Sequence, residues 1–416
     1  MLPLKRYNEA VIRRGVATFT LDSGKCPPWL FARMVKLGRG ITEVLVDEFG
    51  PDEFIRRISD PVWFQSLGTV LAFDWNASGL TTILTAALKE AIRGEERRLG
   101  VFICGGKGKT SRRTPEEIAR WGEWLRLPPG AADGLAYNSK MAAKVDSALV
   151  QDGFQIYHHS FFFSENGAWS VVQQGMNAEA GAARRYHWFS DKTLINADKD
   201  ADLRGSKKKI DFVEEPHAAI ASETFVKNAL NLVSRNSAKT RTLSVEMVQA
   251  GLPSLMKDVT ILRKHSSTLS KMVSLKYGKE QLTLLKLENT EFRTHPVVHE
   301  DFTRSRYLDK ILARMTVAKP KNYEALVALE GVGPKTVRAL ALVGEVIYGA
   351  KPSYEDPARY SFAHGGKDAT PYPVDRPTYD ETIAVLQRAV RRAAWDARDK
   401  DRALWRLAGR RRSAIY

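Results

Sequence analysis

Apolar residues follow different spacings in the two halves of the chain. In residues 15–220, short apolar runs typical of strands stand beside longer runs at helical spacing. From about residue 221 the helical spacing dominates and strand-like runs are few. We therefore predict an α+β fold, with an N-terminal mixed α/β domain over residues 1–220 and a mainly helical domain over residues 221–416.

Four segments carry the prediction for the first domain. Residues 16–22 (VATFTLD) alternate like a strand, and residues 27–50 place apolar residues at helical spacing after two prolines. Residues 97–109 form a short apolar strand that leads into a glycine-rich loop. Residues 154–177 form two apolar and aromatic runs around Asn166-Gly167, a dipeptide that suits a tight turn, and they predict a β-hairpin.

The second domain is predicted from its helical segments. Residues 222–235, 244–251 and 306–317 have helical spacing, and we see no internal repeat. The polar stretches Lys207–Lys209 and 234–242 are expected to be linkers or surface loops.

Residues 322–348 predict two helices joined by a tight glycine turn. One face of each helix is apolar, through Tyr323, Leu326 and Val327 in the first and Val337, Leu340, Ala341 and Ile347 in the second. Gly331 and Gly333 permit the backbone angles of a tight turn, and Pro334 suits the first position of the second helix. The free amides of the turn and of the helix start are expected to form an anion site.

Composition adds a preference for a polyanionic partner. Among 416 residues, 64 Lys and Arg face 48 Asp and Glu, which gives a net charge of +16. Two cysteines are too few for a disulfide framework or a cysteine metal site, and we expect no cofactor and no metal. No apolar run is long enough to span a bilayer and the N-terminus does not look like a signal peptide, so we expect a cytoplasmic protein without a membrane partner.

The glycine-rich loop after residue 103 carries a second candidate for phosphate contact. Gly108-Lys109-Thr110 ends like a nucleotide-binding phosphate loop, but Ile103 stands where that motif needs glycine. Thr114–Glu117 also predicts a capping box that opens the next helix. We therefore interpret the stretch as a basic loop that reaches a nucleic-acid backbone, or as a solvated surface loop; its cations are Lys107, Lys109, Arg112 and Arg113.

Two further basic segments are candidates for nucleic-acid contact. Arg184, Arg185 and Tyr186 alternate cations with an aromatic ring, as in surfaces that stack on unpaired bases, although a strand end with Tyr186 in the core fits equally well. The stretch 388–412 carries ten basic residues against three aspartates and ends in Arg410, Arg411 and Arg412. It predicts a backbone-binding helix beside the glycine turn.

Two motifs that resemble metal sites lack the geometry or the residues needed to bind an ion. His158 and His159 are adjacent on a predicted strand, so they point to opposite faces and cannot chelate one ion. Asp198, Asp200 and Asp202 resemble a calcium loop, but the loop lacks its glycine and its final glutamate.

The 322–348 segment closely resembles the helix-hairpin-helix motif of DNA-repair and recombination proteins. In that motif the turn amides hold one phosphate without reading sequence, and a following lysine or threonine adds a contact. By this resemblance the DNA-binding residues are Gly331, Val332, Gly333, Lys335 and Thr336. The alternative is an ordinary pair of antiparallel helices with a glycine corner.

The helix-hairpin-helix DNA glycosylases imply a catalytic hypothesis. Their lyase members carry a nucleophilic lysine at the position of Lys335 and an aspartate in a later P-V-D, which Asp375 matches. Forty positions separate the two residues, more than in those enzymes. The extra segment, 350–370, would have to loop out or form a pocket of its own, with Tyr354, Tyr360, His364 and Lys367. The alternative is that Lys335 binds phosphate and Asp375 caps a helix.

The chain as a whole is similar to an uncharacterised prokaryotic family, mostly archaeal, of unknown function. The motifs that carry this similarity include "GGKGKTSRRTPEEI", "YHHSFFF", "VVQQGMN", "ARRYHW" and "SFAHGGKD". We expect a protein of DNA repair or processing that binds DNA with little sequence preference, as a glycosylase or abasic-site lyase. A non-enzymatic DNA-structure-binding factor, a metal-dependent nuclease near Asp74 and an RNA-binding protein are the alternatives.

Overall fold

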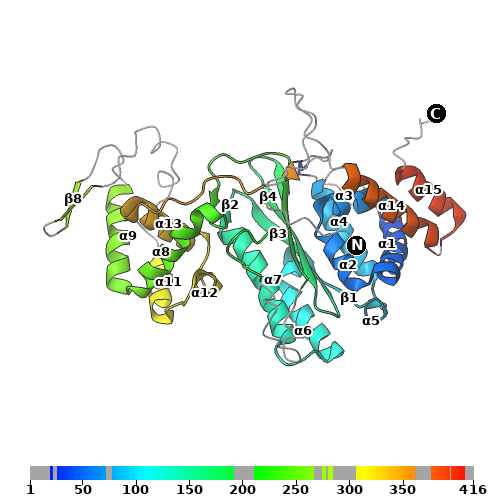
Figure 1. The fold of residues 1–416 in the computed structure, drawn as a ribbon, viewed down its shortest axis with the longest axis horizontal. Helices are drawn as coiled ribbons and strands as arrows, with labels where there is room; N and C mark the ends of the chain where they lie inside the picture. The colour runs from blue at the N-terminus through cyan, green and yellow to red at the C-terminus, as the bar shows by residue number, and fades with distance from the viewer. Residues whose placement is uncertain are drawn as a thin grey trace, which may run out of the picture.

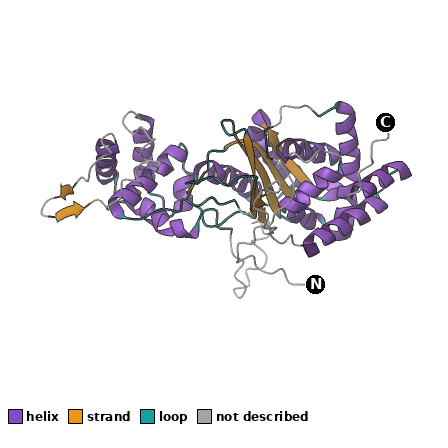
Figure 2. Ribbon diagram, turned by 90° about the horizontal axis from the view of Figure 1, so that it is seen from above, coloured by secondary structure: helices purple, strands orange, loops and turns teal. Residues whose placement is uncertain are grey.

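The computed structural model describes residues 19–21, 26–71, 77–191, 210–266, 274–277, 280–283, 306–358, 360–361, 376–393 and 395–407. The fold is α+β, as predicted. A central sheet carries helices on both faces, and a group of helices extends from one side of it (Figures 1 and 2). Within these ranges, no helix combines the length and the apolar character that a membrane crossing requires.

The central sheet has six strands in the order β1-β3-β4-β5-β6-β10. Its strands are β1 (Val101–Lys107), β3 (Gln155–Ser164), β4 (Trp169–Asn177), β5 (Ala182–Ser190), β6 (Ala219–Ser222) and β10 (Tyr360–Ser361). Neighbours from β1 to β6 are antiparallel, whereas β10 is parallel to β6. Two further antiparallel pairs are β2 (Val150–Gln151) with β7 (Leu230–Asn231), and β8 (Ser274–Tyr277) with β9 (Glu280–Thr283).

The predicted β-hairpin is confirmed. β3 and β4 pair along most of their length, and the turn between them contains Asn166-Gly167. Gly167 has a φ of 98°, the left-handed region that favours glycine. Of the strand predicted over 16–22, Phe19, Thr20 and Leu21 are described, and Thr20 forms a bridge to Ala182.

Helices from the N-terminal part cover one face of the sheet. They are α1 (Pro28–Phe49), α2 (Pro51–Ile58), α3 (Pro61–Val70), α4 (Ala77–Ala91) and the short α5 (Glu96–Leu99). The predicted helix over 27–50 is therefore confirmed as α1. Apolar side chains of these helices form one hydrophobic cluster with Phe162 and Val172 of the sheet.

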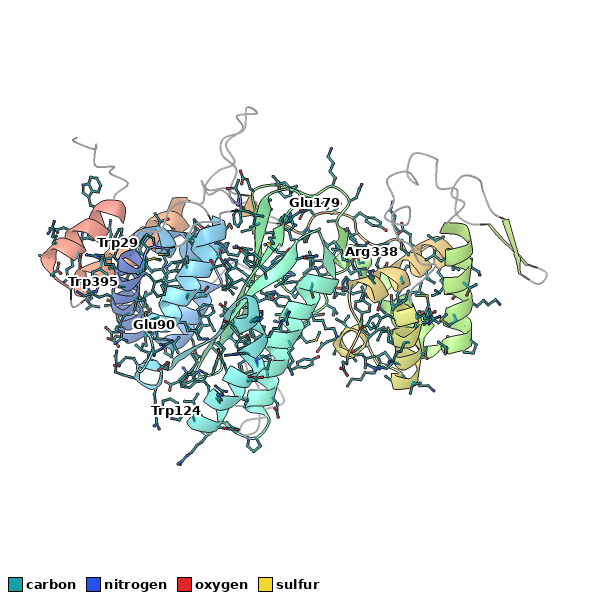
Figure 3. The ribbon with its side chains drawn as sticks, turned by 180° about the vertical axis from the view of Figure 1, so that it is seen from behind. Trp29, Glu90, Trp124, Glu179, Arg338 and Trp395 are labelled. Carbon is teal, nitrogen blue, oxygen red and sulfur yellow. The ribbon has the colours of Figure 1, made fainter. Side chains whose placement is uncertain are left out.

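The last two helices join this same layer. α14 (Arg376–Arg392) lies against α1 and α3, and α15 (Ala397–Leu407) lies against α3. Trp395, between α14 and α15, packs so tightly on α1 that a Cβ added to Gly40 would lie 2.4 Å from the indole Nε1. In the whole molecule, Trp395 lies at one end and Arg338 of α13 lies toward the other (Figure 3).

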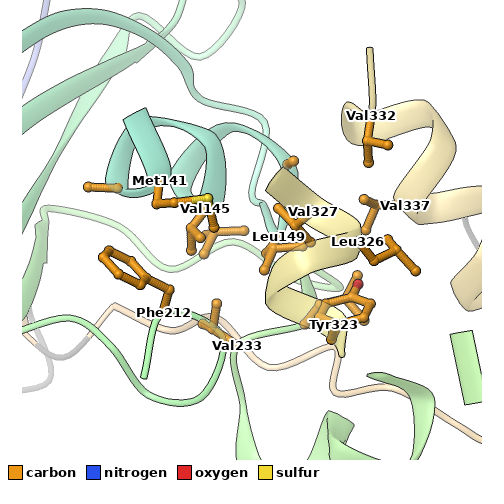
Figure 4. Packing of buried hydrophobic residues seen from close by; sticks show 14 of the residues in the cluster. Met141, Val145, Leu149, Phe212, Val233, Tyr323, Leu326, Val327, Val332 and Val337 are labelled. Atoms are coloured by element: carbon orange, nitrogen blue, oxygen red, sulfur yellow. The ribbon is translucent and has the colours of Figure 1, made fainter. Parts of the chain in front are cut away.

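The opposite face of the sheet shares a core with the helical extension. The helices on this side are α6 (Thr114–Leu125), α7 (Ala131–Ala148), α8 (Ala238–Gln249), α9 (Leu252–Ser266), α11 (Arg306–Ala318), α12 (Tyr323–Ala328) and α13 (Pro334–Tyr348). One hydrophobic cluster includes Trp169 and Trp188 of the sheet and also Leu326 and Val337 of the extension. α7 lies between them and connects the two groups (Figure 4).

The observed organisation differs from a division at residue 220. The shared core crosses that position, and the chain returns to the sheet as β10 after α13. The helical extension is therefore bounded on both sides by segments of the sheet layer. Both parts pack on one continuous apolar core, so the change in apolar spacing near residue 221 does not mark a domain boundary.

Two local predictions are wrong. Residues 222–235 run from the end of β6 through turns and the short strand β7 to the start of a 3-10 helix, and do not form the predicted helix, because Leu230 and Asn231 pair with β2. Residues 234–242 are not a loop: they contain the 3-10 helix η3 (Arg235–Ser237) and the start of α8. Ser234 explains the second error, since its side chain accepts from the Asn236 amide and begins the helical stretch. A polar run that looks like a loop is also what a helix start requires.

Candidate nucleic-acid interface

The predicted pair of helices around residue 330 is present as α12 and α13. Asn322 begins α12 by accepting a hydrogen bond from the Ala325 amide at 2.8 Å. The residues expected on the apolar faces are buried, except the half-buried Ile347, and they pack toward Met141 and Val145 of α7 (Figure 4). The turn between α12 and α13 is thereby fixed against the main body of the protein.

The turn is closed on one side and open on the other. Gly331 has a φ of 85°, and a Cβ there would lie 2.4 Å from Cδ1 of Ile311. Val332 inserts its side chain into the core and is 4% exposed. Gly333 is extended, and a Cβ added to it would meet nothing within 4 Å. A side chain is therefore excluded at Gly331 but has room at Gly333.

The carbonyl oxygens of the turn are held by side chains from neighbouring elements. Leu329 O accepts from Lys144 Nζ (2.5 Å), Glu330 O from Arg314 Nη1 (3.3 Å), Gly331 O from Tyr307 Oη (3.3 Å) and Pro334 O from Gln151 Nε2 (3.0 Å). Arg338 in turn donates to Gln151 Oε1 at 2.6 Å. The negative ends of these peptide dipoles are thus satisfied within the protein.

The first amides of α13 have no side-chain cap. Pro334 is the first residue of the helix, and no side chain caps its N-terminus. The N–H groups of Lys335 and Thr336 fall in the first turn, where an α-helix supplies no acceptor. Together with the helix dipole they make this end of α13 partly positive, a setting that favours an anion.

Exposed cations lie on α13 and on α11, a helix that packs against it. Lys335 is exposed on α13, and Arg306, Lys310 and Arg314 are exposed at positions i, i+4 and i+8 of α11. That spacing places the three on one side of α11. Glu330 is the acidic residue in the turn; its side chain is 96% exposed and its carboxylate lies 3.8 Å from Arg314. The surface combines free amides with an excess of positive charge.

Two of the predicted contact residues can offer a ligand only their backbone groups. The side chains of Val332 and Thr336 are buried, so these two residues can contribute only backbone groups. Gly331 and Gly333 shape the turn, and Lys335 offers both its amide and its ammonium group. The arrangement suits one phosphate held mainly by backbone.

The structure describes one of the two residues of the catalytic hypothesis, Lys335. Lys335 is exposed, whereas an amine nucleophile is usually activated by desolvation or a neighbouring cation. Asp375 lies outside the described residues. Of the pocket suggested for 350–370, Tyr354 is half-buried and its hydroxyl donates to Glu345 at 2.6 Å. The side chains of Tyr360, His364 and Lys367 lie outside the described part of the chain.

The basic loop after β1 is exposed, as both interpretations of it require. It forms the 3-10 helix η1 (Gly108–Arg113), and its four cations Lys107, Lys109, Arg112 and Arg113 are exposed. The predicted capping box is wrong. Thr114 Oγ1 donates to Ser111 O, and Glu117 instead accepts from the Gly105 amide at 2.8 Å and from Lys89 at 2.6 Å.

The cations of β5 are not on the surface. Arg184, Arg185 and Tyr186 have fully buried side chains, which excludes the stacking surface that we expected there and confirms the core alternative for Tyr186. Arg184 pairs with Asp152 at 2.8 Å and with Asp356 at 2.7 Å. The charge of Arg184 is therefore neutralised by carboxylates distant in sequence.

The C-terminal basic stretch does not lie beside the glycine turn. α14 and α15 pack on α1 and α3, at the other end of the molecule from α12 and α13 (Figure 1). One of its cations, Arg392, forms an ion pair with Glu48. Arg410, Arg411 and Arg412 lie outside the described residues.

The expected separation of His158 and His159 is confirmed. His158 Nε2 lies 3.1 Å from Thr85 Oγ1 on the α4 side, and His159 Nε2 lies 2.8 Å from Ser139 Oγ on the α7 side. Among the described residues, no group of three His, Cys, Asp or Glu side chains could hold a metal ion. Asp74 and the aspartates at 198, 200 and 202 lie outside those residues.

Sequence reasoning missed the residues that complete the turn. Tyr307 and Arg314 of α11 and Lys144 of α7 hold its carbonyls, although nothing near them in sequence points to the turn. The spacing of Arg306, Lys310 and Arg314 was a usable signal for a basic helix face.

Comparison with known proteins identifies a family and no function. No curated protein and no solved structure matches the chain. The family described as "Protein of unknown function (DUF763)" matches residues 15–374, most of the chain. The protein is therefore a member of the DUF763 family.

Proposed function

We propose that the protein binds DNA through its sugar–phosphate backbone, with little sequence preference, at the start of α13. One observation carries the proposal: the carbonyls of the turn accept from side chains, while the first amides of α13 have no side-chain cap and the adjacent Lys335 is exposed. Backbone amides and lysine bind phosphate oxygens without reading bases. The net charge of +16 supports a polyanionic partner.

The salt dependence of DNA binding tests this proposal. Affinity of the full chain for duplex, nicked and single-stranded DNA is measured by filter binding between about 50 and 200 mM salt. We expect log affinity to fall linearly with log salt on each DNA that is bound. Absence of binding to all three at the lowest salt would refute the proposal. Competition by RNA of the same sequence at equal or better affinity would favour the RNA-binding alternative.

A role in DNA repair as a glycosylase or abasic-site lyase is a second candidate. It rests on the resemblance of Lys335 and Asp375 to the catalytic pair of helix-hairpin-helix glycosylases. The exposure of Lys335 favours the phosphate-binding role over the nucleophile, and so favours a non-enzymatic DNA-structure-binding factor.

Borohydride trapping on duplex DNA with one abasic site separates these candidates. A lyase forms a Schiff base that borohydride converts into a covalent adduct, and Lys335→Arg would abolish the adduct. If no adduct forms and a panel of damaged bases stays intact, the enzymatic candidate is refuted. Binding at the start of α13 does not depend on either result.

A further inference from the structure

Four polar residues on neighbouring strands form a row across the central sheet. The directly paired residues are Lys107 on β1, His158 on β3, Gln174 on β4 and Arg185 on β5. Directly opposite residues share a face of the sheet, and their side chains are neighbours. This face is the one covered by α2, α3 and α4, where a core of purely apolar side chains would be expected.

Arg185 carries a charge that the described residues do not neutralise. Its side chain is fully buried, and no carboxylate in the described part of the chain lies within ion-pair distance of it. The rings of Phe19 and Phe64 lie 5.5 and 4.8 Å from the guanidinium carbon. Burial lowers the pKa of Arg185 to about 9, so it remains protonated at neutral pH. The neighbouring Arg184, by contrast, has two aspartates.

The hydrogen bonds of Arg185 are few and mostly long. Nε donates to His187 Nε2 at 2.9 Å, but the remaining contacts are longer: Gln65 Oε1 at 3.3 Å, Thr81 Oγ1 at 3.2 Å and Pro61 O at 3.4 Å. Guanidinium offers five N–H donors, and good N–H···O bonds fall near 2.9 Å. The group therefore has unused donor capacity.

Other buried polar atoms in the same place lack partners. Gln65 Nε2, His158 Nδ1 and Gln174 Oε1 are inaccessible to solvent and have no hydrogen-bond partner among the described residues. Gln65 Nε2 belongs to the amide whose oxygen already contacts Arg185. Such orphaned groups are uncommon in folded proteins and require an explanation, such as a bound ion or water.

We propose that the cluster around Arg185, formed with Gln65, Gln174 and His158, is a binding site for a small oxyanion, a phosphate or a carboxylate. An oxyanion supplies negative charge and acceptor atoms, which match the guanidinium and the free amide N–H of Gln65. A protonated oxygen of the anion, as in hydrogen phosphate, would donate to Gln174 Oε1. The full burial of these side chains selects a small free anion over a nucleic-acid strand, so this site is separate from the start of α13.

Thermal unfolding of the full chain in matched salts tests the site. Inorganic phosphate or malonate is titrated at pH 7 against potassium chloride of equal ionic strength, and Tm is followed. A ligand that binds only the folded state raises Tm in a dose-dependent way. We expect one of the two anions to raise Tm of the wild type, and the comparison of the two identifies the preferred chemistry. If neither raises Tm above the chloride control, the proposal is overturned.

Variants locate the binding. Arg185→Met removes the positive charge. Gln65→Leu removes the free amide N–H and serves as the test variant if Arg185→Met does not fold. Each is expected to weaken the apparent anion affinity at least tenfold. Arg93→Ala, an exposed cation that follows α4, is the control and should keep the wild-type affinity. Retained affinity in Gln65→Leu, or its loss in Arg93→Ala, would mean surface binding and would overturn the proposal. DNA affinity should be unchanged in Gln65→Leu.

Discussion

Arg184 and Asp356 form a bidentate ion pair inside the protein, with Nη1–Oδ1 at 2.8 Å and Nη2–Oδ2 at 2.7 Å. The two residues are 172 positions apart in sequence. Asp356 follows the helical extension, so this pair attaches the returning chain to β5. Asp152 completes the environment of the guanidinium from the other side.

Replacing Asp356 should therefore destabilise the whole fold. Asp356→Asn leaves a buried guanidinium with one carboxylate, and removal of one partner of a buried pair typically costs about 3–5 kcal/mol. We expect the free energy of unfolding, measured by urea denaturation, to fall by about 3 kcal/mol, since Asp152 remains. Glu355→Gln, an exposed neighbour, is the control. A loss no larger than in that control would contradict the role assigned to the pair.

The two glycines of the turn should respond differently to the same substitution. Gly331→Ala meets Ile311 and adopts an unfavourable φ, so we expect a loss of about 2–4 kcal/mol in unfolding free energy. Gly333→Ala has free space and should leave stability nearly unchanged. In the proposed binding mode its methyl group would lie beside the phosphate, so DNA affinity should fall about tenfold, or about 1.4 kcal/mol. Wild-type affinity in Gly333→Ala would contradict the proposed approach.

Lys335 should contribute one ionic contact to DNA. Lys335→Ala is expected to reduce the slope of log affinity against log salt by about 1, for every DNA sequence tested. Arg93→Ala, an exposed cation at the end of α4, should leave the slope unchanged. The measurement is the same filter-binding series. Equal slopes in wild type and Lys335→Ala would place the phosphate contact elsewhere.

Stability should fall in mild acid because His158 is buried as a neutral ring. Burial lowers the pKa of His158 from 6.5 to about 3. Below pH 6.5 the unfolded chain binds a proton that the folded chain does not, so stability decreases as pH falls toward 3. For this one group the loss between pH 7 and pH 5 is about 2 kcal/mol.

A variant isolates that contribution. In His158→Gln the difference in unfolding free energy between pH 7 and pH 5 should be about 2 kcal/mol smaller than in the wild type. Urea denaturation at the two pH values measures it. An unchanged pH dependence would mean that His158 is protonated in the folded state.

Local signals explain which predictions from sequence succeeded. The hairpin at Asn166-Gly167 and the pair of helices around Gly331 depend on neighbouring residues, and both are present. Residues 222–235 failed because Leu230 pairs with β2, a partner about eighty residues away that periodicity cannot reveal. The prediction for Arg184 failed for the same reason. Its carboxylates come from Asp152 and Asp356, so a buried strand looked like a basic surface.

The candidate site was predicted only in its local part. Gly331, Gly333 and Lys335 could be named because a tight turn before a helix has a short sequence signature. The groups that hold the carbonyls, such as Tyr307 and Lys144, come from helices distant in sequence. Which surface is positive also depends on packing, as the separation of α15 from α13 demonstrates (Figure 1).

The bridge between Asn231 and Ser353 joins the two places where the chain enters and leaves the helical extension. The Asn231 amide donates to Ser353 O at 2.9 Å, so the outgoing and the returning chain lie side by side. The segment 232–352 is thus inserted into a host that is contiguous in space though not in sequence. Cutting the chain near residue 220 would separate β5 from β6 and α1 from α14, leaving two fragments with incomplete layers. Excision of 232–352 with a short linker keeps these pairings, although it removes part of the shared core, and it would separate the proposed DNA-binding turn from the proposed anion site in a single deletion.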